Sequence, residues 1–203
     1  MQTSNKEKEI LKAAEELFAE KGFKGATTTL IAARAGVTHA MLHYYFRTKE
    51  HIFITVMEGY MREMMGELKE IMMTGIHDVE LIGKVTEKFF DFFCAHKDHL
   101  ALILEVAKTQ PEILQDFIGE LDSHMGPSYR AHKGRTENAV SSGALNNIDF
   151  NDLILNIITV CAAPVLFEPM ISNVTKLDEQ AKAAFYAARK KEAVAMVTAR
   201  LKP

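Results

Sequence analysis

The chain has 203 residues, 48% of them hydrophobic, which is enough for a folded core and argues against disorder. Its formal net charge of −3 gives no general sign of nucleic-acid binding, but residues 1–50 carry eight Lys or Arg against six Glu, so the first quarter is mildly basic and the rest acidic. The two cysteines lie in apolar helical patterns and form no disulfide framework.

Apolar residues at helical spacing run along the whole chain, and strand-like alternation is nearly absent, which predicts an all-α fold of nine to ten helices. The first helix is predicted over Asn5–Lys21, with a capping box at Ser4 and Glu7 and a left-handed end at Gly22. Its apolar stripe is formed by Ile10, Ala14, Leu17 and Phe18.

Two short helices follow, at about Thr29–Ala35 and from a cap at Thr38 to about Phe46, with Gly36 in the turn between them. Thr27 or Thr28 is expected to cap the first of the pair. A long helix starts from a cap at Thr48 and is expected to break over residues 75–78.

The remaining helices are predicted at about 79–95, 99–107, 111–125, 127–142, 150–167 and 179–201. Pro111 and Pro127 suit first-turn positions, and Pro164 and Pro169 are expected to bend or end the penultimate helix. The longest apolar stretch, at 153–167, is judged too short to cross a bilayer, and the polar start of the chain predicts no secretory signal. We therefore expect a cytoplasmic protein without membrane contact.

The segment Thr28–Phe46 fits a helix-turn-helix, because it combines a small residue at Ala32, a turn glycine at Gly36 and a wedge of apolar residues. A helical wheel turns Leu42 and Phe46 toward the core and one polar face outward, toward a DNA major groove. The DNA contacts predicted from these residues are Thr28, Thr38, His39, Ala40, Met41, His43, Tyr44 and Lys49. Of these, Thr28, Tyr44 and Lys49 suit the sugar-phosphate backbone, and Thr38 brings a helix N-terminus near phosphates.

This segment resembles the heads of the tetracycline-repressor (TetR) family. The shared elements are Gly22-Phe23-Lys24-Gly25-Ala26-Thr27-Thr28, Ile31-Ala32, Ala35-Gly36-Val37-Thr38, Leu42, Tyr44, Phe46 and Lys49-Glu50. The family often has Gly at position 40 and Tyr at position 43, where this chain has Ala and His. The resemblance covers about Ile10–Phe53 and implies a contact between Tyr45 and DNA phosphate, although the wheel places Tyr45 partly inward.

The resemblance further implies a DNA-binding domain at 1–48 and a helical domain at 49–203 that binds a small-molecule effector and forms a homodimer on double-stranded operator DNA. Candidate pocket residues are Phe89, Phe93, Leu104, Phe117, Ile118, Leu121, Phe167 and Met170, with an ordinary helical core as the alternative. Candidate dimer residues are Leu153, Ile157, Val160, Cys161, Phe185, Ala188 and Val197, with burial inside one subunit as the alternative.

The sequence predicts no enzyme, cofactor or metal site, because it lacks a phosphate-binding glycine loop, a nucleophile elbow and a Cys-x-x-Cys pair. His96 with His99, and His39 with His43, could each supply two metal ligands, but neither pair has a third ligand at fixed spacing. We expect a ligand-responsive transcriptional regulator, a repressor released from a palindromic operator by its effector. The alternative is an all-helical protein-interaction module with a vestigial helix-turn-helix.

Overall fold

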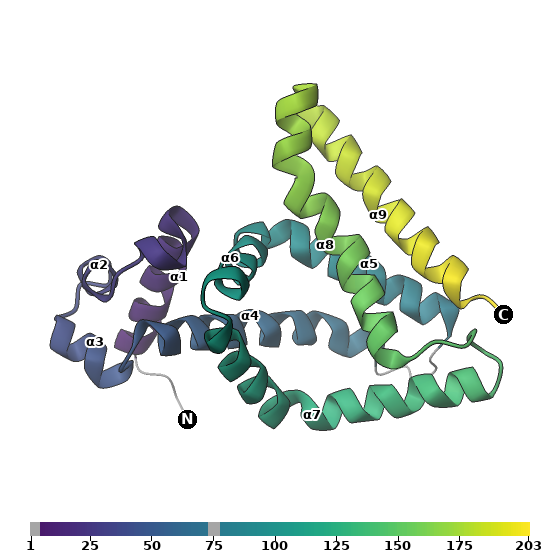
Figure 1. Cartoon of the computed structure of the whole chain (residues 1–203), viewed down its shortest axis with the longest axis horizontal. Helices are drawn as coiled ribbons and strands as arrows, with labels where there is room; N and C mark the ends of the chain where they lie inside the picture. The colour runs from purple at the N-terminus through teal and green to yellow at the C-terminus, as the bar shows by residue number, and fades with distance from the viewer. Residues whose placement is uncertain (1–4, 73–77) are drawn as a thin grey trace. The chain divides into compact units, whose positions relative to one another are not determined.

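The computed structural model describes residues 5–72 and 78–203, apart from the side chains of residues 70, 121, 123 and 124. Regular structure in this part of the chain is entirely helical, which confirms the predicted all-α class (Figure 1). The helices of the described residues are α1 (Asn5–Gly25), α2 (Thr28–Arg34), α3 (His39–Tyr45), α4 (Lys49–Met72), α5 (Val79–Ala95), α6 (Lys97–Thr109), α7 (Pro111–Ser141), α8 (Phe150–Thr175) and α9 (Glu179–Leu201). The predicted cap Ser4 and residues 75–77 of the predicted break lie outside the described residues.

Side-chain caps start most of the helices, as the sequence predicted for α2, α3 and α4. The hydroxyls of Thr27, Thr38 and Thr48 accept hydrogen bonds from backbone N–H groups at 3.3, 3.2 and 3.2 Å. Carboxylates perform the same function at the starts of α5, α8 and α9, from Asp78, Asp149 and Asp178.

Three prolines lie inside helices, one where the sequence predicted the start of a new helix and two where it predicted a bend or an end. The helix α7 continues through Pro127, so the two helices predicted at 111–125 and 127–142 are one, and that prediction was wrong. The helix α8 continues through Pro164 and Pro169 to Thr175 and ends at Lys176, whose φ is 51°. A proline removes one amide donor from a helix, and the other hydrogen bonds of these long helices remain. By length and composition alone, the 26-residue helix α8 is long and apolar enough to cross a membrane, a test that the core helix of a soluble protein also passes.

Backbone contacts divide the chain into two compact units. The first unit joins Met1–Glu63 with Asp98–His124, and the second joins Met64–Lys97 with Met125–Pro203. These are units of packing, and the functional division predicted between residues 48 and 49 stays a prediction.

The first unit has one apolar core, to which α1 to α4, α6 and the start of α7 all contribute. The rings of Phe18, Phe23 and Phe53 meet at its centre, with centroids 5.4 to 6.2 Å apart. Val106 of α6 and Phe117 of α7 belong to the same cluster. The helix-turn-helix is therefore built on a core that includes Val106 and Phe117, which lie 60 to 89 positions further along the chain.

The second unit is built around α5, which packs against both α8 and α9, while α8 and α9 also lie side by side (Figure 1). Gly83 allows a close approach, because a Cβ at this position would lie 3.3 Å from the Thr198 methyl group of α9. From α8, Cys161 is fully buried and its Sγ donates to the carbonyl of Thr86 in α5 at 3.5 Å. One side of α8 is thus committed to the interior of this unit.

Candidate nucleic-acid interface

The turn between α2 and α3 has the geometry that the sequence predicted. Gly36 has a φ of 63°, a conformation that side chains disfavour, and the amide of Val37 donates to the carbonyl of Ala32 at 3.0 Å. Thr38 then caps α3. The turn is therefore fixed by backbone and cap hydrogen bonds between Ala32 and Met41.

One side of α3 holds the helix to the core of the first unit. Leu42 is fully buried and Phe46 nearly so, and both pack in the cluster that contains Ile31 and Ala32 of α2. Substitution of a fully buried Leu by Ala costs about 2–5 kcal/mol. The anchor of α3 is thus made of side chains that cannot reach a partner molecule.

The other side of α3 faces solvent. His39, Ala40, Met41 and His43 are exposed, and Tyr44 has 82% of its surface accessible. Tyr45 is half-buried and packs against the core, as the helical wheel predicted. Except for Tyr45, the predicted reading residues of α3 form one accessible face.

Hydrogen bonds and ring contacts order the polar groups of this face. The hydroxyl of Thr28 lies 3.1 Å from Nε2 of His39, and the rings of His39 and His43 meet edge to face at 4.4 Å. Nδ1 of His43 lies 2.9 Å from the backbone carbonyl oxygen of Arg47. The face is therefore partly preorganised before any partner binds.

Lys49, predicted to contact phosphate, instead turns toward the core of the first unit. Its Nζ donates to the carbonyl of Phe23 at 2.8 Å and lies 4.2 Å from the centre of the Phe23 ring. Burial lowers the pKa of Lys49, against the opposing effects of Glu50 and Glu105. In this conformation the ammonium group stabilises the end of α1, and a phosphate contact from Lys49 stays a prediction.

Glu105 of α6 stabilises the same segment and was missed by the sequence analysis. Its carboxylate accepts from the amides of Phe23 at 3.0 Å and of Lys24 at 3.3 Å. Gly22, with φ 68° and ψ 176°, leaves space for this carboxylate, because a Cβ there would lie 2.6 Å from Glu105 Oε2. No local sequence pattern predicts this contact, because Glu105 lies 82 residues from Phe23 and 81 residues from Lys24.

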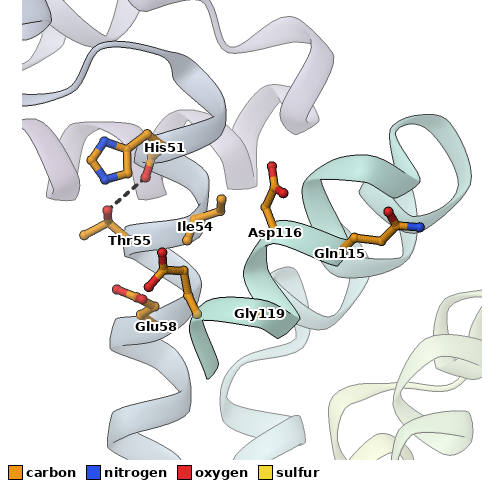
Figure 2. Close-up of a pocket in the computed structure, with 8 residues that line it drawn as sticks. His51, Ile54, Thr55, Glu58, Gln115, Asp116 and Gly119 are labelled. Atoms are coloured by element: carbon orange, nitrogen blue, oxygen red, sulfur yellow. Dashed lines mark hydrogen bonds between the residues drawn. The ribbon is translucent and has the colours of Figure 1, made fainter. Parts of the chain in front are cut away.

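An open cleft lies between α4 and α7 within the first unit, with a volume of about 590 Å³. In Figure 2, His51, Ile54, Thr55 and Glu58 line it from α4, opposite α7. The hydroxyl of Thr55 donates to the carbonyl of His51 at 2.8 Å. From α7 the lining residues are Gln115, Asp116, Gly119 and Glu120. With three carboxylates the cleft disfavours anionic ligands, and none of the predicted pocket residues line it.

The structure divides the predicted pocket residues between the two packing units. In the first unit Phe117 belongs to the core, while Leu104 and Ile118 are exposed. In the second unit the rings of Phe89 and Phe93 meet edge to face at 5.8 Å, and Phe167 and Met170 are exposed. The side chain of Leu121 lies outside the described residues. An effector pocket formed by these residues stays a prediction.

Most of the predicted dimer residues are buried within the subunit, which is the alternative that the sequence left open. Leu153, Ile157, Cys161 and Val197 are at most 4% exposed, because α5, α8 and α9 cover one another there. Val160 and Phe185 are half-buried, and Ala188 is exposed. The accessible apolar surface of α8 lies on its other side, at Leu155, Ile158, Phe167, Met170 and Val174. The four buried residues therefore pack inside the subunit, and a dimer interface formed by the other predicted residues stays a prediction.

In the described part of the chain, no three His, Cys, Asp or Glu side chains are grouped so that they could hold a metal ion. The rings of His39 and His43 are in contact, and Nε2 of His99 lies 3.0 Å from Oε1 of Glu15 in α1. The absence of a metal site stays a prediction.

The helix-turn-helix and the residues that support it match a known family. Residues 10–56 match the model for bacterial regulatory proteins of the tetR family. Residues 10–56 are thus similar to the helix-turn-helix segment of this family. The match covers α2 and α3 and extends into α4, which includes both the anchor and the exposed face of α3.

The curated relatives that the chain matches are transcriptional regulators. It is 30% identical over 118 residues to the uncharacterized HTH-type transcriptional regulator YerO of Bacillus subtilis, covering 56% of this chain and 41% of YerO. It is 27% identical over 97 residues to the transcriptional activator FasR of Mycolicibacterium smegmatis, covering 48% of this chain and 44% of FasR. The chain thus spans less than half the length of these two relatives.

The fold of the chain also occurs in solved structures. The regulator FadR of Bacillus subtilis, solved in complex with stearoyl-CoA, aligns with a TM-score of 0.68 over 95% of this chain and 98% of FadR. The two sequences are 20% identical over this alignment, so the likeness shows a common fold.

Proposed function

We propose that the chain is a ligand-responsive transcriptional repressor that binds a palindromic operator as a homodimer in the cytoplasm. The observation that carries the proposal is the exposed face of α3, formed by His39, Ala40, His43 and Tyr44 opposite the buried Leu42. A helix of this kind fits the major groove, where base edges present distinct patterns of donors and acceptors. The match of residues 10–56 to the tetR family supports the same docking mode.

Different residues of the face serve affinity and specificity. Ala40 and Met41 suit contact with thymine methyl groups, and the imidazoles suit hydrogen bonds to base edges. Tyr44 suits the phosphate backbone, together with the amides at the N-terminus of α3. The head would therefore be positioned by phosphates and would read sequence through only a few side chains.

The dimer in this proposal uses the exposed side of α8. Leu155, Met170 and Val174 are 61%, 59% and 78% exposed, and Met196 of α9 is 55% exposed. Large apolar side chains that line up on one side of a helix are a typical protein interface. Two heads about 34–36 Å apart would then read successive major grooves.

The regulatory step is proposed as a change of population. An effector that binds better to a conformation with unsuitable head spacing lowers operator affinity by its differential binding energy, typically about 1–3 kcal/mol. The long helix α4, which is separated by three residues from the end of α3 at Tyr45, is the candidate connection. The effector itself is a small molecule of unassigned chemistry.

Selection of bound sequences from a random duplex pool tests the proposal. We expect an enriched palindrome, and an affinity for it that falls steeply between 50 and 200 mM salt, by about 10³-fold or more if six or more phosphates are contacted. The variant Tyr44→Ala should weaken binding, whereas Glu112→Ala, an exposed change on α7, should not. An interaction module without DNA function would enrich no sequence and show no salt dependence on any duplex.

A further inference from the structure

His43 has a fixed hydrogen-bonding polarity. It lies on the exposed face of α3, and its Nδ1 is 2.9 Å from the carbonyl oxygen of Arg47. A carbonyl oxygen only accepts hydrogen bonds, so Nδ1 must carry the proton of this contact. In a neutral imidazole the other nitrogen is then an acceptor. Within the described residues, Nε2 of His43 has no hydrogen-bond partner.

The neighbouring His39 is not constrained in the same way. Its Nε2 lies 3.1 Å from the hydroxyl of Thr28, and a hydroxyl can both donate and accept. Either tautomer of His39 therefore satisfies this contact. His39 and His43 share one face, but the protein fixes the tautomer of His43 alone. His39 therefore serves as a matched control.

We propose that His43 is a specificity-determining residue that accepts a hydrogen bond from an exocyclic amino group of the operator. In the major groove the donors of this kind are N4 of cytosine and N6 of adenine, whereas guanine presents only the acceptors N7 and O6. The inference rests on the proposed function, since it requires α3 to enter the groove. It goes beyond the proposed function, because it assigns His43 to the recognition of one class of base group, the exocyclic amino groups.

The arrangement also determines what His43 does not read. A neutral imidazole has one N–H donor, and in His43 the carbonyl of Arg47 accepts from it. The neutral ring therefore has no free donor with which to contact N7 of a purine. A side chain such as Arg, which only donates, would have the opposite preference and select guanine. Substitution at position 43 is therefore expected to change the class of base group, in addition to the affinity.

The test begins with operators selected at pH 8, where free imidazole side chains are uncharged. The base pair whose preference disappears in His43→Ala is first identified. In the wild-type operator its adenine is then replaced by purine, or its cytosine by 2-pyrimidinone, which removes only the amino group. Parallel duplexes carry the 7-deaza purine at the same pair, which removes only the N7 acceptor.

We expect loss of the amino group to weaken wild-type binding by about fivefold or more and to have little effect on His43→Ala, while the 7-deaza change affects both proteins equally. In His43→Arg the dependence should move to the purine N7. His39→Ala should retain the wild-type dependence on the amino group. Coupling of wild-type His43 to N7, or equal effects of amino removal in wild type and His43→Ala, would overturn the inference.

Failure of the inference and failure of the proposed function give different results. If no sequence is enriched by the wild-type protein, DNA reading itself is wrong and the polarity of His43 has no role. If a palindrome is enriched but no base pair depends on His43, only the inference fails. Thermal unfolding of each variant confirms that the exposed substitutions leave the fold intact.

Discussion

Cys161 illustrates how burial changes the chemistry of a single side chain. It is fully buried on the inner side of α8, and its thiol donates to the Thr86 carbonyl. Burial raises the pKa of the Cys161 thiol from its ordinary value of 9 to about 12, because the thiolate would lose its hydration. The group is therefore a protonated hydrophobe in the folded chain and an ordinary acid in the unfolded chain.

The free energy of unfolding should fall as the pH rises above 9. Between pH 9 and 12 the unfolded chain releases the Cys161 proton and the folded chain retains it, so deprotonation favours unfolding. The titration of Cys161 should therefore lower the free energy of unfolding at pH 10.5 by about 2 kcal/mol relative to pH 8. Urea unfolding at both pH values measures it, and Cys161→Ala should show a correspondingly smaller loss.

Cys94→Ala provides the comparison for this experiment. The pKa of Cys94 is raised to about 11, again mainly by burial, although this residue is only half-buried. Cys94→Ala should therefore reduce the pH dependence of the free energy of unfolding by less than Cys161→Ala does. Equal slopes in the wild type and in Cys161→Ala would contradict the assignment.

Residue roles that depend on near neighbours were predictable from the sequence. Gly36, Thr38 and Leu42 were predicted as turn, cap and anchor, because each requirement involves residues within about seven positions. The inward turn of Lys49 and the role of Glu105 were not predictable. Both depend on the carbonyl and amides around Phe23, which the fold brings close from 26, 81 and 82 residues away.

At the scale of elements, the end of α1 is determined by α4 and α6 as well as by its own sequence. Gly22 has a positive φ, as the sequence predicted, but its ψ of 176° places it in a region that glycine alone adopts readily, outside the left-handed helical region. The Glu105 carboxylate occupies the space above it, and Lys49 binds the carbonyl of the next residue. One short segment thus joins three helices.

We expect Gly22→Ala to destabilise the protein by more than Gly36→Ala. Both glycines have a positive φ, but a Cβ at Gly36 meets nothing within 4 Å, whereas a Cβ at Gly22 meets the Glu105 carboxylate at 2.6 Å. The expected losses are about 1 kcal/mol at Gly36 and about 2–4 kcal/mol at Gly22. Chemical unfolding gives both values.

The double variant Gly22→Ala/Glu105→Ala separates strain from steric conflict. Removal of Glu105 eliminates the close contact and leaves the backbone strain, so the two single losses should sum to more than the loss of the double variant. Additive losses would show that Glu105 does not limit the space at Gly22. Operator affinity of Glu105→Gln then reports whether the carboxylate also positions the head.

Helix ends that depend on caps were predicted well, and those that depend on proline were not. The bounds of α5 and α9 agree with the prediction, whereas α7 and α8 continue through three prolines. A proline in the first turn and one in the interior look alike in a short window of sequence. Only packing along the whole helix distinguishes them: buried Thr136 and Ala139 lie beyond Pro127, and buried Val165 and Glu168 lie beyond Pro164.

At the scale of the whole molecule, the proposed dimer depends on which side of α8 the chain itself covers. Both sides are apolar in sequence, so the helical pattern could not separate an internal stripe from an external one. The structure separates them, because Leu153, Ile157 and Cys161 pack inward while Leu155 and Met170 stay exposed. Interfaces formed with other chains leave no local signal that distinguishes them from the core.

We expect Leu155→Glu combined with Met170→Glu to convert a wild-type dimer into a monomer, because two carboxylates would be buried in an apolar contact. Analytical ultracentrifugation measures the change, and operator affinity should fall by about 100-fold or more as the two heads become independent. Ile118→Glu replaces a comparably exposed side chain on α7 and is expected to leave the dimer intact. A persistent dimer in the double variant would place the interface elsewhere.

The division of α3 into a buried side and an exposed side has a consequence for how such proteins diversify. Leu42 and Phe46 hold the helix in place, while His39, Ala40, His43 and Tyr44 contribute little to the core. Substitutions at these four positions can redirect the head to new operators at little risk to folding, since exposed changes usually alter stability by less than about 0.5 kcal/mol. After duplication of the gene, a copy could therefore acquire new target promoters by single point mutations while its scaffold stays under unchanged selection.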